Sequence, residues 1–266
     1  MSLLKIENLH TYFETPQGLV KAVKGISFEL QKGKTLGIVG ESGSGKSQTA
    51  IAILKLLNNN SKVHYKGKIF FNEEEISKYN QKKMEKIRGN EIAMIFQDAM
   101  SSLNPVFKIK DQIMEILKLH KKISVQEGEK KIFEILNKVQ INDIPRVMNS
   151  YPHQLSGGMC QRIMISMALI CEPKLLIADE PTTALDVIIQ QEILNLINNL
   201  QKEIKTSILF ITHDLGVISQ MVDDVIVMYK GEIVEKGSIK EILTKPKHDY
   251  TKSLLNDFLK TKFQNY

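Results

Sequence analysis

The sequence predicts an α/β fold built on a mostly parallel sheet, and three observations support this prediction. Short apolar runs at residues 35–39, 175–178 and 207–211 have the length and unbroken hydrophobicity of strands buried on both faces. Residues 3–30 alternate enough between apolar and polar to indicate an antiparallel layer. Residues 108–166 repeat apolar side chains at helical spacing, which indicates an inserted helical region.

Composition limits the class of protein. The chain has 266 residues, of which 42% are hydrophobic, and this is enough for one large or two modest subdomains with real cores. No apolar run approaches the roughly 18 residues that a membrane helix needs, and the N-terminus lacks the apolar segment of a signal peptide. We therefore expect a cytoplasmic protein whose membrane contact comes through another protein.

Cysteine usage and charge exclude other classes. Cys160 and Cys171 are isolated and show no metal-type spacing, which suits a reducing compartment. The formal net charge is +6, but the lysines are scattered without interleaved aromatic residues. An ordinary solvated surface explains this basic balance better than a nucleic-acid site.

A glycine-rich loop at residues 40–47 follows the first apolar run and precedes a stretch of helix formers. Its glycines leave the backbone N–H groups free to point into one concavity at a helix N-terminus, where phosphate binds. Lys46 would supply charge to the β- and γ-phosphates, and the Ser47 hydroxyl would be a ligand for Mg²⁺. The strand and helix flanks disfavour a mere glycine-rich turn. The expected nucleotide contacts are Gly40, Glu41, Ser42, Gly43, Ser44, Gly45, Lys46, Ser47 and Gln48.

Two carboxylates stand at the end of the second apolar run. Ligands in parallel sheets bind at the carboxyl ends of the strands, where Asp179 and Glu180 lie. Asp179 would hold Mg²⁺ through water, and Glu180 would polarise the water that attacks the γ-phosphate. An isolated pair of carboxylates is usually a solvated strand end. Here Pro181 stops the strand at once and residues 182–186 follow as a Thr-Thr-Ala-Leu-Asp loop, which favours the functional interpretation.

Two further polar residues follow apolar runs. His213 comes just after residues 207–211, at a strand end from which it could reach the γ-phosphate. A lone histidine beside an apolar run is more often structural, but its place after the strand of Asp179 and Glu180 favours catalysis. Gln97 ends the run 92–96, and its neutral amide could touch both the Mg²⁺ shell and a moving neighbour. Taken alone, Gln97 would carry no information.

A third motif, residues 155–162, lies between the glycine-rich loop and the acidic strand end. Within it, Ser156-Gly157-Gly158 opens a helix and forms another anion site, with the serine hydroxyl and backbone N–H groups facing outward. In this order, and followed by Asp186 and His213, the motifs resemble those of the ATP-binding cassette ATPases of transporters. The resemblance spans residues 12–213.

The finer pattern is similar to the peptide- and nickel-importer branch of these ATPases, and most of all to oligopeptide-importer subunits. The segments that carry this finer similarity are residues 15–18, 40–50, 94–98, 101–105, 151–153 and 156–159. Cys160 departs from the branch, where arginine is common, and Asp249 replaces the second proline of a Pro-His-Pro-Tyr-Thr element. Many subunits of the branch continue into a cysteine-bearing tail. This sequence shows no such cysteines, so no iron–sulfur cluster is expected.

The resemblance implies a P-loop NTPase core of RecA type, with ATP and Mg²⁺ bound. It implies that Ser156, Gly157, Gly158 and Asp186 act on ATP held by a second cassette, because two cassettes sandwich two nucleotides head to tail. The implied partners are a non-identical paralogous cassette, two transmembrane permeases and an extracytoplasmic solute-binding protein. The complex would place this chain on the cytoplasmic face of the inner or plasma membrane, as a peripheral subunit that powers import.

The resemblance also sets expected boundaries and one base contact. We expect a single cassette domain over residues 1–266, with a nucleotide-binding core at 1–97 and 167–235. Residues 98–166 would form the helical signature subdomain and residues 236–266 a C-terminal extension. Tyr12 is the aromatic residue that the family pattern would stack on adenine, and cross-strand packing is its alternative role.

Other functions remain open at this point. Cassettes that act on nucleic acid interrupt the domain with long coiled coils or carry two cassettes, whereas this chain has one copy of each motif. A kinase or GTPase would lack the Ser156-Gly157-Gly158 element and the histidine switch. An exporter half would commonly be fused to membrane helices. Within the importer branch, oligopeptide is the expected cargo, and dipeptide or nickel is the alternative.

Overall fold

The structure is a computed structural model that describes residues 1–57, 62–183 and 185–263. The polar loop at residues 58–61 and Ala184, which belongs to the loop before Asp186, lie outside the described residues. The chain divides into two compact units, Met1–Met84 with Ser207–Tyr266 and Glu85–Thr206. The predicted subdomain limits stay predictions, because these units are defined by contacts alone.

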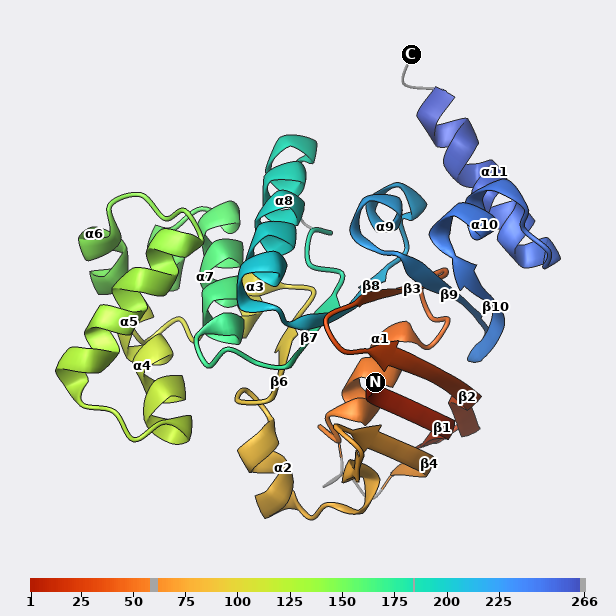
Figure 1. Ribbon diagram of the computed structural model, residues 1–266, viewed down its shortest axis with the longest axis horizontal. Helices are drawn as coiled ribbons and strands as arrows, with labels where there is room; N and C mark the ends of the chain where they lie inside the picture. Colours follow the sequence, from red (N-terminus) through yellow and green to blue (C-terminus); the bar gives the residue numbers. More distant parts are fainter. Residues whose placement is uncertain (58–61, 184, 264–266) are drawn as a thin grey trace. The chain divides into compact units, whose positions relative to one another are not determined.

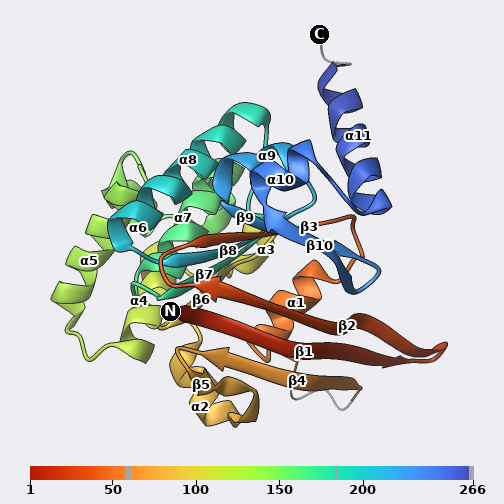
Figure 2. The ribbon, with the colours of Figure 1, turned by 45° about the vertical axis from the view of Figure 1, so that its right-hand side comes forward.

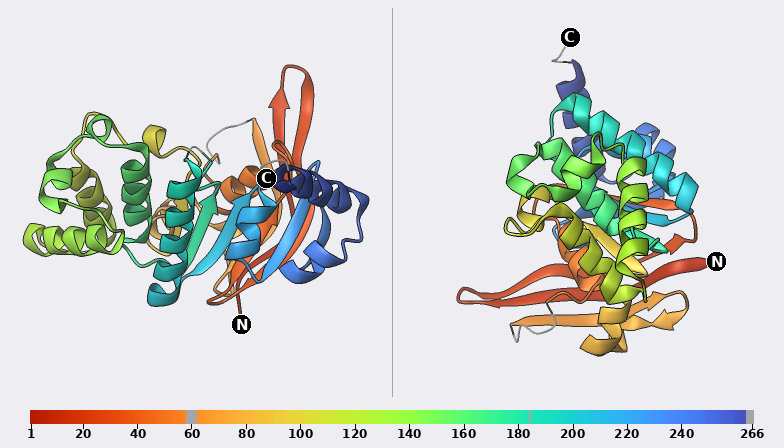
Figure 3. Two further views of the ribbon diagram at one scale, coloured as in Figure 1. Left: turned by 90° about the horizontal axis from the view of Figure 1, so that it is seen from above. Right: turned by 90° about the vertical axis from the view of Figure 1, so that its left-hand side faces the viewer.

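An antiparallel sheet forms the N-terminal layer of the first unit, as the alternation predicted (Figure 2). Its strands, in spatial order, are β2 (Gly18–Gln31), β1 (Ser2–Thr15), β4 (Val63–Phe71) and β5 (Glu74–Glu75). Thr15 pairs with Gly18 across a two-residue turn, which closes the long red hairpin of Figure 3. Apolar residues of one face of β1 and β2 are buried, which makes this layer part of a core.

A second sheet of the first unit holds two of the predicted buried strands. β3 (Thr35–Val39) pairs in parallel with β8 (Ser207–Thr212) on one side and with β9 (Asp224–Tyr229) on the other. Every residue of β3 and β8 is buried, so the unbroken apolar runs have the environment that their composition requires. β10 (Glu232–Ser238) pairs antiparallel to β9 and ends this sheet.

Helices of the first unit contact both of its sheets. They are α1 (Lys46–Ile53), η1 (Ile76–Lys78), α9 (Leu215–Met221), α10 (Ile239–Thr244) and α11 (Asp249–Phe263), while α2 (Gln81–Ile87) spans the boundary between the units. α9 packs closely on β3, since a Cβ at Gly37 would lie 2.5 Å from Ile218 Cδ1. α10 and α11 lie beside β10 (Figure 1).

The second unit combines two parallel strands with the predicted helical region. β6 (Ile92–Ile95) pairs in parallel with β7 (Leu175–Asp179), and every residue of β7 is buried. The helices are α3 (Ala99–Ser102), α4 (Ile109–His120), α5 (Val125–Lys138), α6 (Ile144–Asn149), η2 (Pro152–Gln154), α7 (Gly157–Leu169) and α8 (Val187–Ile204). In Figure 1, α3 appears in yellow, and the colours of the later helices run through green to the cyan of α8.

The helical spacing of residues 108–166 identified core positions correctly. Ile113, Leu117, Ile132 and Leu136 are buried, whereas Ile116 is only half-buried. Within the described ranges, no helix combines the length and the apolar run needed to cross a bilayer.

Candidate functional site

The glycine-rich loop joins β3 to α1 in the first unit, as its flanks predicted. A Cβ at Gly40 would lie 2.1 Å from the carbonyl oxygen of Met228, so only glycine fits there. Gly45 has a φ of 100° and its Cβ would lie 2.4 Å from the carbonyl oxygen of Ala22. Gly43 faces open space, with nothing within 4 Å of an ideal Cβ. The loop is therefore tightly seated at both ends and open in its middle.

Polar groups of the loop fit a bound polyphosphate. Lys46 is 4% exposed, and its Nζ donates to the carbonyl oxygens of Gly40 at 2.7 Å and Glu41 at 2.8 Å. Ser44 Oγ and Gln48 Oε1 are buried without a hydrogen-bond partner in the described part of the chain. A buried polar group without a partner costs free energy, and in a phosphate loop at a helix N-terminus a ligand can supply that partner.

His213 and the loop belong to the same edge of one sheet. β3 and β8 are parallel, and Val39 pairs with Thr212. Gly40 directly follows β3, and His213 directly follows β8. Both residues therefore lie at the carboxyl edge of these strands, where ligands bind. His213 is exposed, and Asp214 beside it caps α9 by accepting the N–H groups of Gly216 and Val217. The register therefore brings together the loop and the histidine that the sequence singled out.

The acidic strand end lies in the second unit. Asp179 ends β7 and is 5% exposed, and Glu180 follows it at 8% exposed. Glu180 Oε2 accepts hydrogen bonds from Gln97 Nε2 at 3.0 Å and from Thr183 Oγ1 at 2.9 Å. Gln97 and Glu180, which sequence analysis treated separately, are therefore in direct contact. The sequence did not indicate Thr183 as a site residue, although the loop at residues 182–186 directly follows Asp179, Glu180 and Pro181.

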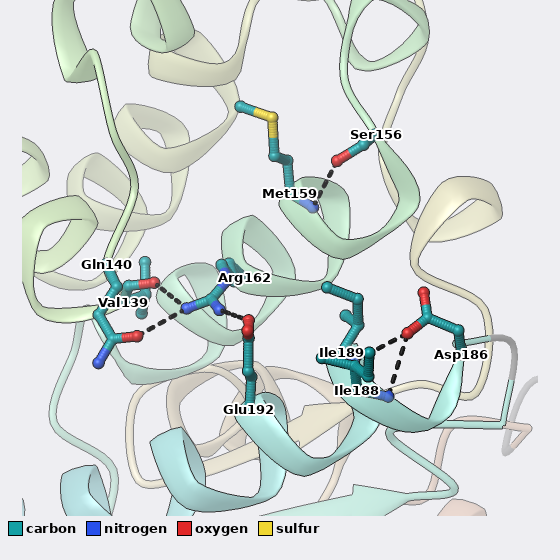
Figure 4. Close-up of polar contacts among 9 residues, drawn as sticks. All are labelled: Val139, Gln140, Ser156, Met159, Arg162, Asp186, Ile188, Ile189 and Glu192. Carbon is teal, nitrogen blue, oxygen red and sulfur yellow. Dashed lines mark hydrogen bonds and ion pairs between the residues drawn. The ribbon is translucent and has the colours of Figure 1, made fainter.

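The signature segment caps a helix as expected. Ser156 is the N-cap of α7, and its Oγ accepts the N–H of Met159 at 3.3 Å (Figure 4). Ser156 and Gly157 are exposed, and nothing lies within 4 Å of an ideal Cβ at Gly157. Ser156 Oγ only accepts in this bond, so its hydroxyl can still donate, and the exposed backbone of Gly157 beside it suits an anion site.

Asp186 caps the neighbouring helix in the same way. Its Oδ1 accepts the N–H groups of Ile188 at 3.1 Å and Ile189 at 3.0 Å, at the start of α8 (Figure 4). A Cβ at Gly158 would lie 3.0 Å from Ile189 Cγ2, so the beginnings of α7 and α8 are in close contact. The structure thus brings together Ser156, Gly157, Gly158 and Asp186.

Arg162 fixes the signature helix to its neighbours. Its guanidinium donates to Val139 O at 3.0 Å and Gln140 Oε1 at 3.1 Å, where α5 ends, and to Glu192 Oε2 on α8 at 2.7 Å (Figure 4). One residue earlier, Gln161 Nε2 donates to Pro181 O at 2.6 Å, directly after Glu180. The signature helix is therefore tied to the acidic loop of its own unit.

Cys160 lies inside this arrangement. It is 0% exposed, its Sγ donates to Pro152 O at 3.6 Å, and burial raises the pKa of its thiol. A buried protonated thiol is a small packing group. The departure from the branch at Cys160 is therefore accommodated in the core, while Ser156 and Gly157 keep their exposure.

Tyr12 is half-buried on β1 and has polar surroundings. Its hydroxyl is 2.8 Å from His10 Nδ1, and the Nζ atoms of Lys21 and Lys66 lie 6.0 and 5.9 Å from its ring centroid. Tyr12 also pairs with Lys21 across the β1–β2 hairpin. These contacts agree with cross-strand packing, and adenine stacking by Tyr12 stays a prediction.

A phosphate loop between a buried strand and a helix, an acidic strand end and a capped signature helix define an ATP-binding cassette. Residues 23–183 match the ABC transporter family, and the chain belongs to this family. The predicted P-loop NTPase fold is confirmed by a solved dimeric ATP-binding cassette in a post-hydrolysis state, bound to ADP and Pi. The two share 26% sequence identity at a TM-score of 0.79, over 89% of this chain and 98% of that chain.

Curated relatives match nearly the whole chain. The oligopeptide transport ATP-binding protein OppD of Bacillus subtilis is 51% identical over 253 residues, which are 95% of this chain and 71% of that protein. The dipeptide transport ATP-binding protein DppD of the same organism is 49% identical over 253 residues, which are 95% of this chain and 76% of that protein.

Proposed function

We propose that this chain is the ATP-hydrolysing subunit of a bacterial importer for oligopeptides. The observation that carries ATP hydrolysis is the Glu180 carboxylate, which Gln97 and Thr183 hold at the end of a buried strand. Identity of 51% to an oligopeptide transport ATP-binding protein supports the cargo. A dipeptide importer is the second candidate, because the identity to DppD is 49%. Nickel remains an alternative within the branch, whereas the named relatives give no support to a function on nucleic acid.

The proposed chemistry follows from the residues in each unit. The loop from Gly40 to Gln48 would bind the phosphates of ATP through its N–H groups, and Lys46 would neutralise the β- and γ-phosphates. Glu180 would polarise the attacking water, and His213 would contact the γ-phosphate. Phosphoryl transfer depends mainly on such positioning and electrostatic stabilisation.

The oxygen donors of the two units suit Mg²⁺. Ser47 offers a hydroxyl, Gln97 an amide oxygen and Asp179 a carboxylate that would act through water. Mg²⁺ prefers such hard oxygen ligands and keeps several waters when it binds together with phosphates. Bound together with the phosphates of ATP, such an ion would neutralise charge that develops on the phosphate oxygens.

A second cassette would complete the site. Ser156 and Gly157 are exposed, and next to Asp186 two large apolar side chains, Val187 and Ile188, are 82% and 74% exposed. Exposed apolar side chains beside an outward anion site suit a surface that meets a partner. We propose a non-identical paralogue as this partner, with two permeases and a solute-binding protein, on the cytoplasmic face of the membrane.

Uptake by the assembled complex tests this function. The chain would be purified with its partner cassette and permeases, reconstituted in vesicles with the solute-binding protein, and supplied with ATP. Labelled pentapeptide, dipeptide and Ni²⁺ would be compared for uptake and for stimulation of ATP hydrolysis. Oligopeptide is expected to give the largest stimulation. Stimulation by dipeptide or Ni²⁺ alone would assign the other cargo, and ATP hydrolysis unaffected by all three would reject an importer.

A further inference from the structure

The C-terminal segment of the first unit contacts the phosphate loop directly. Tyr250, near the start of α11, accepts the backbone N–H of Glu41 on its hydroxyl oxygen at 2.8 Å, across 209 positions of sequence. Tyr250 belongs to residues 236–266, which the sequence predicted to be a C-terminal extension. None of the roles assigned above to loop residues uses this contact.

The contact acts on one particular peptide group. The peptide between Gly40 and Glu41 has its carbonyl oxygen bound by Lys46 Nζ at 2.7 Å and its N–H bound by the Tyr250 hydroxyl at 2.8 Å. Both ends of that peptide group are therefore fixed. This matters because Gly40 has no side chain to restrict its own backbone.

Tyr250 is itself well anchored. Its ring stacks on that of Tyr229, the last residue of β9, with centroids 4.1 Å apart and an interplanar angle of 27°. The preceding residues are tied to β10, since the N–H groups of Lys247 and His248 donate to the Glu235 carboxylate at 2.8 and 3.0 Å. Burial raises the pKa of Tyr250, so its hydroxyl stays neutral at neutral pH. The hydroxyl is thus an acceptor held at a fixed place.

Nucleotide binding would change the hydrogen bond at the carbonyl end of this peptide group. When phosphates occupy the loop, the Lys46 ammonium is drawn to them, and its hydrogen bonds to the carbonyl oxygens of Gly40 and Glu41 weaken. The Tyr250 hydroxyl then becomes the remaining side-chain contact on the peptide between Gly40 and Glu41. A loop that keeps its geometry loses less conformational entropy when it binds.

We propose that Tyr250 is a positioning residue of the nucleotide site, which holds the peptide between Gly40 and Glu41 in the orientation that ATP requires. This inference rests on the proposed binding of ATP by the loop, and it extends that proposal to α11. It predicts that nucleotide binding and the order of α11 are coupled, and such coupling is reciprocal.

The test is Tyr250→Phe, which removes the hydroxyl and keeps the ring that stacks on Tyr229. Loss of one hydrogen bond should raise the Kd and KM for ATP about threefold to tenfold and change kcat less than about twofold. Tyr79→Phe is the matched control, because it removes another tyrosine hydroxyl of the first unit, which donates to Glu74. A merely structural role would lower the thermal midpoint of Tyr250→Phe and leave KM unchanged.

Lys46→Ala separates this inference from the function on which it rests. If Lys46→Ala abolishes ATP binding and Tyr250→Phe leaves Kd and KM unchanged, the positioning role is wrong and the proposed function stands. If Lys46→Ala binds ATP normally, both proposals fail.

A second measurement needs no variant. Hydrogen exchange of backbone amides in residues 249–260 of the wild type would be compared with and without a non-hydrolysable ATP analogue. The analogue should slow their exchange severalfold. Equal exchange rates in the two samples would overturn the proposed coupling, even if Tyr250→Phe proved unable to fold.

Discussion

Glu180 combines an uncommon backbone conformation with a side chain that is held in place. Its φ is 47°, in the left-handed region that residues with a side chain seldom adopt. Such strain persists only where surrounding contacts overdetermine the conformation. Here two hydrogen bonds, from Gln97 and Thr183, reach the same carboxylate oxygen. The strain thus falls on the residue proposed to polarise the attacking water.

Glu180→Gln tests that role, because the amide has nearly the same shape and cannot act as a base. We expect unchanged ATP affinity and a kcat lowered by about 100-fold or more. Equilibrium binding of ATP and steady-state hydrolysis in the assembled complex would be measured side by side. Hydrolysis at the wild-type rate would remove Glu180 from the catalytic residues.

Thr183→Val tests the support of that carboxylate. The substitution keeps the shape of the side chain and deletes the hydroxyl that donates to Glu180 at 2.9 Å. We expect kcat to fall about threefold to tenfold with KM changed less than about twofold. Thr244→Val is the control, since it deletes a threonine hydroxyl that donates to Lys240 O in α10. Equal kcat values for the two variants would show that Thr183 does not position Glu180.

At the scale of elements, periodic apolar patterns predicted the buried strands and the helical region well. They did not predict side-chain contacts between distant residues. The buried strands β3, β7 and β8 were evident because an unbroken apolar run needs no knowledge of its partners. Gln112 shows the opposite case. It is 6% exposed on α4, and its amide binds the backbone of Asn104 and Phe107. Nothing in the helical spacing indicates a buried amide.

The same difference between local features and distant contacts applies to the candidate site. Gly40 to Ser47, Asp179, Glu180 and the start of α7 were predicted, because strand ends and helix caps are local features. The contact of Gln97 with Glu180 spans 83 positions and that of Tyr250 with Glu41 spans 209. Such pairs depend on how the chain folds back on itself, which one sequence does not reveal.

Arg162→Met tests how the signature helix is held. The Arg162 side chain is 12% exposed and binds groups where α5 ends and on α8. Removing it leaves Val139 O without this donor, so we expect a loss of about 1 to 2 kcal/mol and a thermal midpoint lower by about 2–4 °C. Lys138→Met breaks an ion pair between two side chains that are 42% and 54% exposed, and should cost less than about 0.5 kcal/mol. Thermal unfolding of the two variants would be compared. Equal shifts of their thermal midpoints would contradict this role of Arg162.

At the scale of the whole molecule, a signature that acts on ATP held by a second cassette would make hydrolysis depend on assembly. Ser156→Arg places a large cation at the exposed start of α7 in the second unit, and it leaves the phosphate loop of the first unit unchanged. We expect unchanged ATP binding by the isolated chain and hydrolysis by the complex lowered about tenfold or more. Full hydrolysis in a dilute, demonstrably monomeric wild-type sample would show instead that one cassette suffices.

Coupling to a permease would begin at Gln97. The amide contacts Glu180 at 3.0 Å and lies just before α3 and the loop to α4. Four large apolar side chains in this stretch are exposed: Phe96, Met100, Val106 and Phe107. An exposed apolar stretch beside a residue that contacts Glu180, the proposed catalytic carboxylate, suits a surface on which a permease could rest. ATP-driven rearrangement at Glu180 would then move the helical region through Gln97.

Gln97→Ala should therefore separate hydrolysis from transport. We expect peptide uptake to fall more than ATP binding does, and the stimulation of hydrolysis by peptide-loaded binding protein to shrink. Linked sites share a coupling free energy of typically about 1 to 3 kcal/mol, which corresponds to roughly 5-fold to 150-fold. The loss of stimulated ATP hydrolysis should not exceed this range. Uptake and hydrolysis would be recorded together in vesicles, with Gln191→Ala on the exposed surface of α8 as the control. If Gln97→Ala kept the wild-type ratio of peptide transported to ATP hydrolysed, and the same stimulation, Gln97 would only support the Glu180 side chain. The route to the permease would then have to run through other residues.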